Sequence, residues 1–184
     1  MIPGGYIYKH VMTRPDWLKN APGVIDIYSI SSCISKDFGD YVKHWKHNGL
    51  WLFDRPEIMH DIARADSIDL TDLTLFYYEA FEQEFREPDN AWVPLVIKDF
   101  PMNVSPPRQK TLRGYDVCTF WAGSSAECSP LSCNSLCKDM SVNSHCLFDA
   151  FEQAWQAIDS GLFANSEPGP YRIFAVYTVS DAAA

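Results

Sequence analysis

Four cysteines and a histidine lie close together in the second half of the chain. Cys128, Cys133, Cys137 and Cys146 are separated by gaps of four, three and eight residues, and His145 precedes the last of them. Thiolates and a histidine in this number can complete a tetrahedral zinc site. Structural zinc sites usually take their ligands in two tight pairs, and the spacing here is wider. We therefore expect no cofactor, and buried thiols at Cys133, Cys137 and Cys146, since cysteine packs as a small apolar residue.

Cys128 has a second possible role, as a nucleophile. It follows a run of small residues and precedes an expected helix, whose dipole would lower the pKa of the thiol. His145 is the nearest base in the sequence, so the expected catalytic set is Cys128, Glu127 and His145. No nucleophile signature surrounds Cys128, and the carboxylate of Glu127 would raise the thiol pKa. A cysteine enzyme is therefore an alternative, and the leading hypothesis is a protein without catalysis.

The charge of the chain is negative and unevenly distributed. The formal net charge is −9, and residues 54–89 hold eleven acids against three bases, a balance of −8. Phosphate binding needs clustered lysines and arginines, so this distribution argues against a nucleic-acid partner. An acidic surface that also carries aromatic side chains favours a basic protein partner. The residues expected on this surface are Asp61, Asp66, Asp69, Asp72, Glu79, Glu82, Glu84, Tyr78 and Trp92.

Two segments of the chain repeat the same pattern of residues. Residues 31–63 align with residues 126–158 without a gap at an offset of 95, with seven identities in 33 positions. Apolar residues recur at helical spacing in both segments, from Phe38 to Trp45 and from Cys133 to Met140. A short apolar run that ends at an Asp follows in each, and Asp54 and Asp149 are expected to cap a second helix. We therefore expect an internal repeat of 24–85 and 114–180, joined by a proline-rich connection over 86–113.

The same pattern predicts the fold class. Strands are expected over 24–30, 50–53 and 73–81 in the first half and over 115–121, 145–148 and 171–179 in the second. Residues 92–97 are expected to add an edge strand, because Pro94 does not suit a central one. A chain of 184 residues has about the length of one domain, and residues before 24 are expected to pack as irregular chain. We expect an α/β fold, a mixed sheet with two strand-helix-strand-helix-strand halves, with a two-layer α+β sandwich as the alternative.

Three functions are compatible with these features. The leading hypothesis is an acidic cytoplasmic protein-binding factor, such as an immunity or inhibitor protein, that presents residues 54–89 to a basic partner. The alternatives are the cysteine-dependent enzyme and a small-ligand binder or sensor at a cleft between the Cys33 and Cys128 loops. No apolar run reaches the roughly 18 residues of a membrane span, and the first ten residues lack the pattern of a signal peptide, so we expect a cytoplasmic protein without a membrane partner.

Overall fold

The computed structural model describes residues 1–31, 47–97, 101–120, 128–164 and 166–180. Within these ranges the chain forms nine regular elements besides short 3-10 turns. In chain order they are β1 (Ile2–Lys9), β2 (Met12–Thr13), β3 (Asp26–Ile27), α1 (Pro56–Asp66), β4 (Thr74–Arg86), β5 (Ala91–Pro94), β6 (Thr111–Thr119), α2 (Phe151–Asp159) and β7 (Tyr171–Thr178). Neither described helix is long and apolar enough to cross a membrane.

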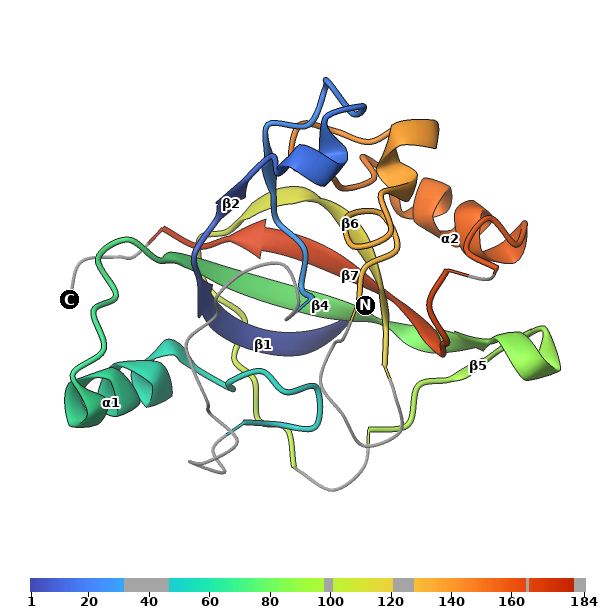
Figure 1. Cartoon of the computed structure of the whole chain (residues 1–184). Helices are drawn as coiled ribbons and strands as arrows, with labels where there is room; N and C mark the ends of the chain where they lie inside the picture. Colours follow the sequence, from blue (N-terminus) through green and yellow to red (C-terminus); the bar gives the residue numbers. More distant parts are fainter. Residues whose placement is uncertain (32–46, 98–100, 121–127, 165, 181–184) are drawn as a thin grey trace.

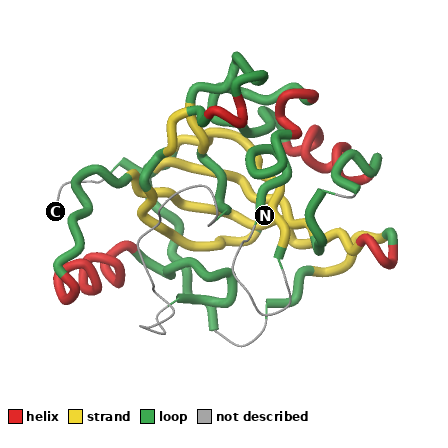
Figure 2. The backbone as a smooth tube through the Cα atoms, in the orientation of Figure 1, coloured by secondary structure: helices red, strands yellow, loops and turns green. Residues whose placement is uncertain are grey.

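One antiparallel sheet organises the described part of the chain. Its strands lie in the order β1-β4-β7-β6, and β5 pairs with the far end of β4 (Figures 1 and 2). The expected combination of helices with a sheet is confirmed. The expected mixed sheet is wrong, because every described strand pair is antiparallel. This pairing is the one that the α+β alternative requires.

Both faces of the sheet are buried at its central strand β4. Successive side chains of a strand point to opposite faces, yet Leu75, Phe76, Tyr77 and Tyr78 on β4 are all at most 4 % exposed. Figure 1 shows the two helices at opposite ends of the sheet, with α1 beside β1 and α2 above β6 and β7. The chain therefore crosses the whole sheet along β4 between the two helical regions.

Two asparagine turns attach the segments before α1 and α2 to the outer strands. Asn48 donates from Nδ2 to the Gly4 carbonyl at 2.8 Å, and its Oδ1 accepts from the amides of Leu50 and Leu52. Asn143 makes the same three kinds of bond, to the Arg113 carbonyl at 2.7 Å and from the amides of His145 and Leu147.

The residues after each turn pair with an outer strand of the sheet. Phe53 exchanges two backbone hydrogen bonds with Tyr6 on β1, and Phe148 does the same with Tyr115 on β6. Gly5 and Gly114, which precede the two tyrosines, have φ of +134° and +143°. A Cβ on either would lie within 2.8 Å of the facing backbone oxygen, so both positions need glycine. β1 and β6 therefore make matching contacts with the segments that follow the two turns.

Several expected elements are shorter or different in the structure. Only Asp26 and Ile27 of the expected 24–30 strand pair, and they pair with β2 outside the main sheet. The expected helix over 133–140 is wrong: Ser135 has a left-handed φ of 61°, and only a 3-10 turn (Leu136–Asp139) follows. The runs 50–53 and 145–148 are turns that each end in one bridge. Residues 32–46, which contain Cys33 and the stripe from Phe38 to Trp45, lie outside the described ranges.

The strands of the sheet itself are better predicted from the sequence. The strands expected over 73–81, 115–121 and 171–179 correspond to β4, β6 and β7, although β4 is longer than expected. β5 is the edge strand expected near Pro94. The expectation of irregular chain before residue 24 is wrong for residues 2–9, which form the buried strand β1 of the sheet.

Both helices begin near the expected place, but neither is capped by the expected aspartate. The N-cap residues are Arg55 and Ala150. Asp54 instead accepts hydrogen bonds from Asn48 Nδ2 and from the Asn103 amide. At α2 the Gln153 side chain accepts from the Ala150 amide at 3.0 Å, which satisfies one of the first free amides of the helix.

Candidate functional site

The expected catalytic residues are held by separate contacts. His145 Nδ1 lies 2.6 Å from Asp26 Oδ1, and its ring stacks on Tyr28 with 4.0 Å between centroids. The Cys128 carbonyl accepts from the Thr119 amide at 2.8 Å, which fixes that residue at the end of β6. Glu127 lies outside the described ranges. The carboxylate that orients the histidine is therefore Asp26, on a different segment from the one expected.

Two of the cysteines near His145 are buried among apolar side chains. Cys137 and Cys146 are 3 % and 1 % exposed and pack in the cluster beneath α2. A hydrogen bond to Cys137, together with burial, raises the pKa of Cys146 far above its ordinary range. No group of three or more His, Cys, Asp or Glu side chains within the described ranges is arranged to hold a metal ion.

A buried polar network lies between the start of the chain and β6. Asp116 is fully buried and accepts hydrogen bonds from Ser29 Oγ and Ser129 Oγ, both at 2.7 Å, and from the Ile30 amide at 3.0 Å. The Lys9 ammonium, 2 % exposed, donates to the carbonyls of residues 29, 30 and 31. Burial raises the pKa of Asp116, although these donors and the Lys9 charge act in the opposite direction. The network joins the 29–31 segment to the sheet.

The acidic segment 54–89 does not form one surface. Asp61, Asp66, Asp69 and Asp72 are exposed on α1 and on the loop that follows it. The next residues enter β4, whose 13 residues cover roughly 40 Å at about 3.3 Å per residue. Residues 82–89 therefore lie at the opposite end of the sheet from α1 (Figure 1). A partner that contacts one end does not contact the other through this segment.

The acids on β4 are paired within the protein. Glu84, 4 % exposed, binds Arg172 at 2.9 Å and Arg86 at 3.1 Å. Glu82 is exposed and lies 3.2 Å from the N-terminal ammonium. Tyr78 is completely buried, so it and Glu84 cannot contribute to the expected exposed surface.

Glu79 is also paired, in a partly buried position. It forms an ion pair with Lys110 and accepts from the Tyr177 hydroxyl at 2.9 Å. Burial acts to raise its pKa, but the hydrogen bonds from Lys110 and the tyrosines outweigh burial and lower it. The charge of this carboxylate is already compensated by Lys110, so Glu79 offers little to a partner.

Trp92 belongs to a partly exposed group of aromatic side chains that we call the aromatic patch. Its members are Phe81 on β4, Trp92 on β5, and Phe151 and Trp155 on α2. Trp92 and Trp155 stack with 6.0 Å between centroids and an interplanar angle of 13°, and Phe81 contacts both Trp92 and Phe151 edge-on. All four pack against the buried cluster beneath α2, so their rings are held in place from below.

Carboxylates border the aromatic patch, and bases are scarce around it. The Trp92 indole donates to Asp159 Oδ1 at 3.3 Å, and Glu152 is exposed on the first turn of α2. Residues 139–171 contain five acids and no lysine or arginine. The surface around α2 thus combines partly exposed indole rings with an excess of negative charge, of which, within the described ranges, Asp139 alone has a neighbouring lysine, Lys138 at 3.9 Å.

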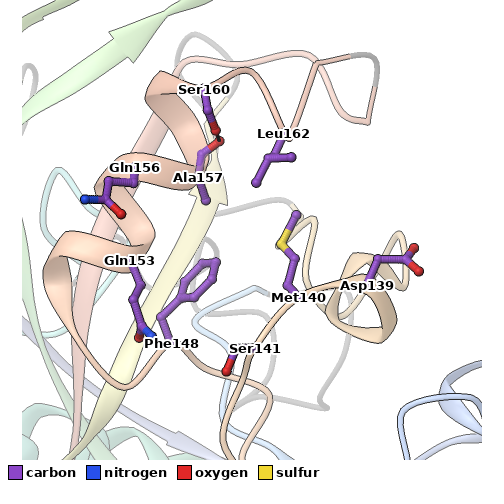
Figure 3. Close-up of a pocket in the computed structure, with 9 residues that line it drawn as sticks. All are labelled: Asp139, Met140, Ser141, Phe148, Gln153, Gln156, Ala157, Ser160 and Leu162. Carbon is purple, nitrogen blue, oxygen red and sulfur yellow. Dashed lines mark hydrogen bonds between the residues drawn. The ribbon is translucent and has the colours of Figure 1, made fainter.

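A groove lies along the other side of α2 (Figure 3). It has a volume of about 420 Å³ and runs between the helix and residues 139–141. Phe148, Met140 and Leu162 point toward one another across it, while the Asp139 carboxylate points away from its centre. Ala157 and four polar uncharged residues complete the lining: Ser141, Gln153, Gln156 and Ser160.

Sequence reasoning identified Trp92 but missed the other members of the aromatic patch. Phe151 and Trp155 stand four residues apart, which places them on one face of α2. The absence of lysine and arginine from residues 139–171 is also visible in the sequence. These two signals together indicate that α2 carries the contact surface, whereas the larger negative charge of residues 54–89 favours the segment that contains α1.

Comparison with known proteins adds no relative: no family model, no curated protein and no solved structure matches this chain.

Proposed function

We propose that this protein is a binding factor that captures a basic protein partner with the aromatic patch and the carboxylates around α2. The observation that carries the proposal is the pairing of two partly exposed tryptophans with Asp159 and Glu152. Tryptophan is enriched at the positions of interfaces that contribute most binding energy. Its ring faces also attract lysine and arginine, by about 0.5–2 kcal/mol per contact.

The negative charge supports a basic partner in particular. Five acids without a lysine or arginine over residues 139–171 produce a local field that speeds encounter with a cationic surface. This combination of aromatic anchors and negative charge suits an immunity or inhibitor protein that blocks a basic enzyme. We infer that it acts in the cytoplasm, which the free thiols of Cys118, Cys137 and Cys146 support, since reducing compartments keep thiols unpaired.

We also infer that the chain arose from an internal duplication. The matched bonds of Asn48 and Asn143 support this, as do the matched pairings of Phe53 with β1 and of Phe148 with β6. In this interpretation α1 and α2 are equivalent helices at opposite ends of the sheet. The exposed acids of α1 are then the alternative contact surface for the same partner.

The proposal is tested by capture on the immobilised protein, followed by identification of the bound partner. We compare wild type with two double variants, Glu152→Lys/Asp159→Lys at α2 and Asp61→Lys/Asp66→Lys at α1. Both raise the net charge by the same amount, so a difference between them reports the location of the contact. We expect a basic partner that is lost with the α2 variant, retained with the α1 variant, and weakened by salt. Loss with the α1 variant alone would move the surface to α1.

A further inference from the structure

We infer that the groove beside α2 is an anchor site for a cationic amphipathic segment of the partner, one that inserts apolar side chains and carries lysine or arginine beside them. This inference rests on the proposed function and adds to it the chemistry of the partner's contact segment. The groove lies on the face of α2 formed by Gln153, Gln156 and Ala157, beside the C-cap residue Ser160, and Trp155 on the same helix belongs to the aromatic patch.

The walls of the groove determine the apolar part of the ligand. Phe148, Met140 and Leu162 converge on its centre (Figure 3). Phe148 is anchored from below by its backbone bridge to Tyr115, whereas Leu162 is 56 % exposed. A large exposed leucine beside an open groove gains from contact with an apolar side chain. The flexible Met140 side chain can adapt to the shape of what enters.

The surroundings of the groove determine the charge of the ligand. Its lining contains no base, and its polar groups are two glutamines, two serines and Asp139. The lysine and arginine nearest to residues 139–171 in the sequence are Lys138 and Arg172, and Arg172 is ion-paired with Glu84. Asp139 lines the groove, and Glu152 and Asp159 are exposed on α2, against one neighbouring base among the described residues, Lys138, which lies 3.9 Å from Asp139. The net negative charge attracts a cationic segment and disfavours an anionic one. The volume of about 420 Å³ falls within the roughly 300–1,000 Å³ typical of ligand pockets.

The test uses a short labelled peptide of leucine and lysine as the probe and fluorescence anisotropy as the readout. Two control peptides replace its lysines with glutamate or its leucines with glutamine. The protein variants are Leu162→Lys, at the groove, and Ile25→Lys, at another aliphatic side chain that is 67 % exposed. Both substitutions change the charge equally at exposed positions, so neither is expected to unfold the protein.

We expect saturable binding of the leucine–lysine peptide by wild type and by Ile25→Lys, with affinities that agree within about twofold. Leu162→Lys should weaken binding by about tenfold or more, and both control peptides should bind weakly. Equal binding by Leu162→Lys and Ile25→Lys, or no saturable binding below about 1 mM, would overturn the inference. If Glu152→Lys/Asp159→Lys abolishes partner capture while Leu162→Lys does not, the proposed function stands and the anchor site falls.

Discussion

Replacing Asn143 with alanine tests the turn that attaches α2 to the sheet. The substitution removes three hydrogen bonds, to the Arg113 carbonyl at 2.7 Å and from the amides of His145 and Leu147 at 2.9 and 3.2 Å. Each bond contributes about 1 kcal/mol, and the backbone groups left behind are only partly accessible to water. We therefore expect a loss of about 3 kcal/mol in the free energy of unfolding, which corresponds to about 6–12 °C in Tm for a chain of this length.

The assay is urea unfolding followed by tryptophan fluorescence, analysed by linear extrapolation. Asn48→Ala is the comparison variant: it removes the equivalent bonds and one more, to Asp54 at 3.0 Å, so it should cost at least as much. Asn103→Ala is the control, because Asn103 is exposed and contacts Asp54 through its backbone amide; we expect less than about 0.5 kcal/mol. A loss below about 1 kcal/mol for Asn143→Ala would refute the argument that these side-chain bonds hold the turn.

Two further predictions concern ionisable groups. Burial raises the pKa of Asp116 above its ordinary value of 3.8, so the folded state binds more protons than the unfolded state and stability falls as pH rises from about 4 toward the raised folded value. Asp116→Asn should remove this dependence, and parallel pH profiles of wild type and variant would contradict the assignment. Cys118 and Cys146 should resist alkylation at pH 8 until the protein unfolds, because burial and neighbouring groups raise both thiol pKa values. Rapid labelling of Cys128 below pH 7, mapped by mass spectrometry, would instead favour the cysteine enzyme.

The sheet was largely predictable because its central strands carry local signals. β4 and β7 are rich in aromatic and β-branched residues, and Pro94 marks β5 as an edge strand. β1 was missed because Pro3, Gly4 and Gly5 indicate a turn. The structure uses Gly5 instead at a bulge that faces the Phe53 carbonyl, a contact with a segment nearly fifty residues away.

The candidate site was predictable only in its composition. The prediction that Asp54 caps α1 is wrong, because Asp54 accepts hydrogen bonds from Asn48 and from the Asn103 amide. A distant partner of that kind leaves no local signal in the sequence. Trp92 and Trp155 meet because β5 pairs with β4 beneath α2, which depends on strand order and register. The acids of residues 54–89 lie at two ends of the sheet because β4 is long. The alternation of apolar and polar residues alone does not predict that length.

The most direct measurement is the affinity of the purified partner, determined by calorimetry, for wild type and for the two matched charge-reversal variants. We predict that Glu152→Lys/Asp159→Lys weakens binding by about tenfold or more while Asp61→Lys/Asp66→Lys changes it by less than about twofold. Equal weakening by both variants would show that only net charge matters. Weakening by the α1 variant alone would contradict the account, because the contact would then lie at the opposite end of the sheet from the aromatic patch.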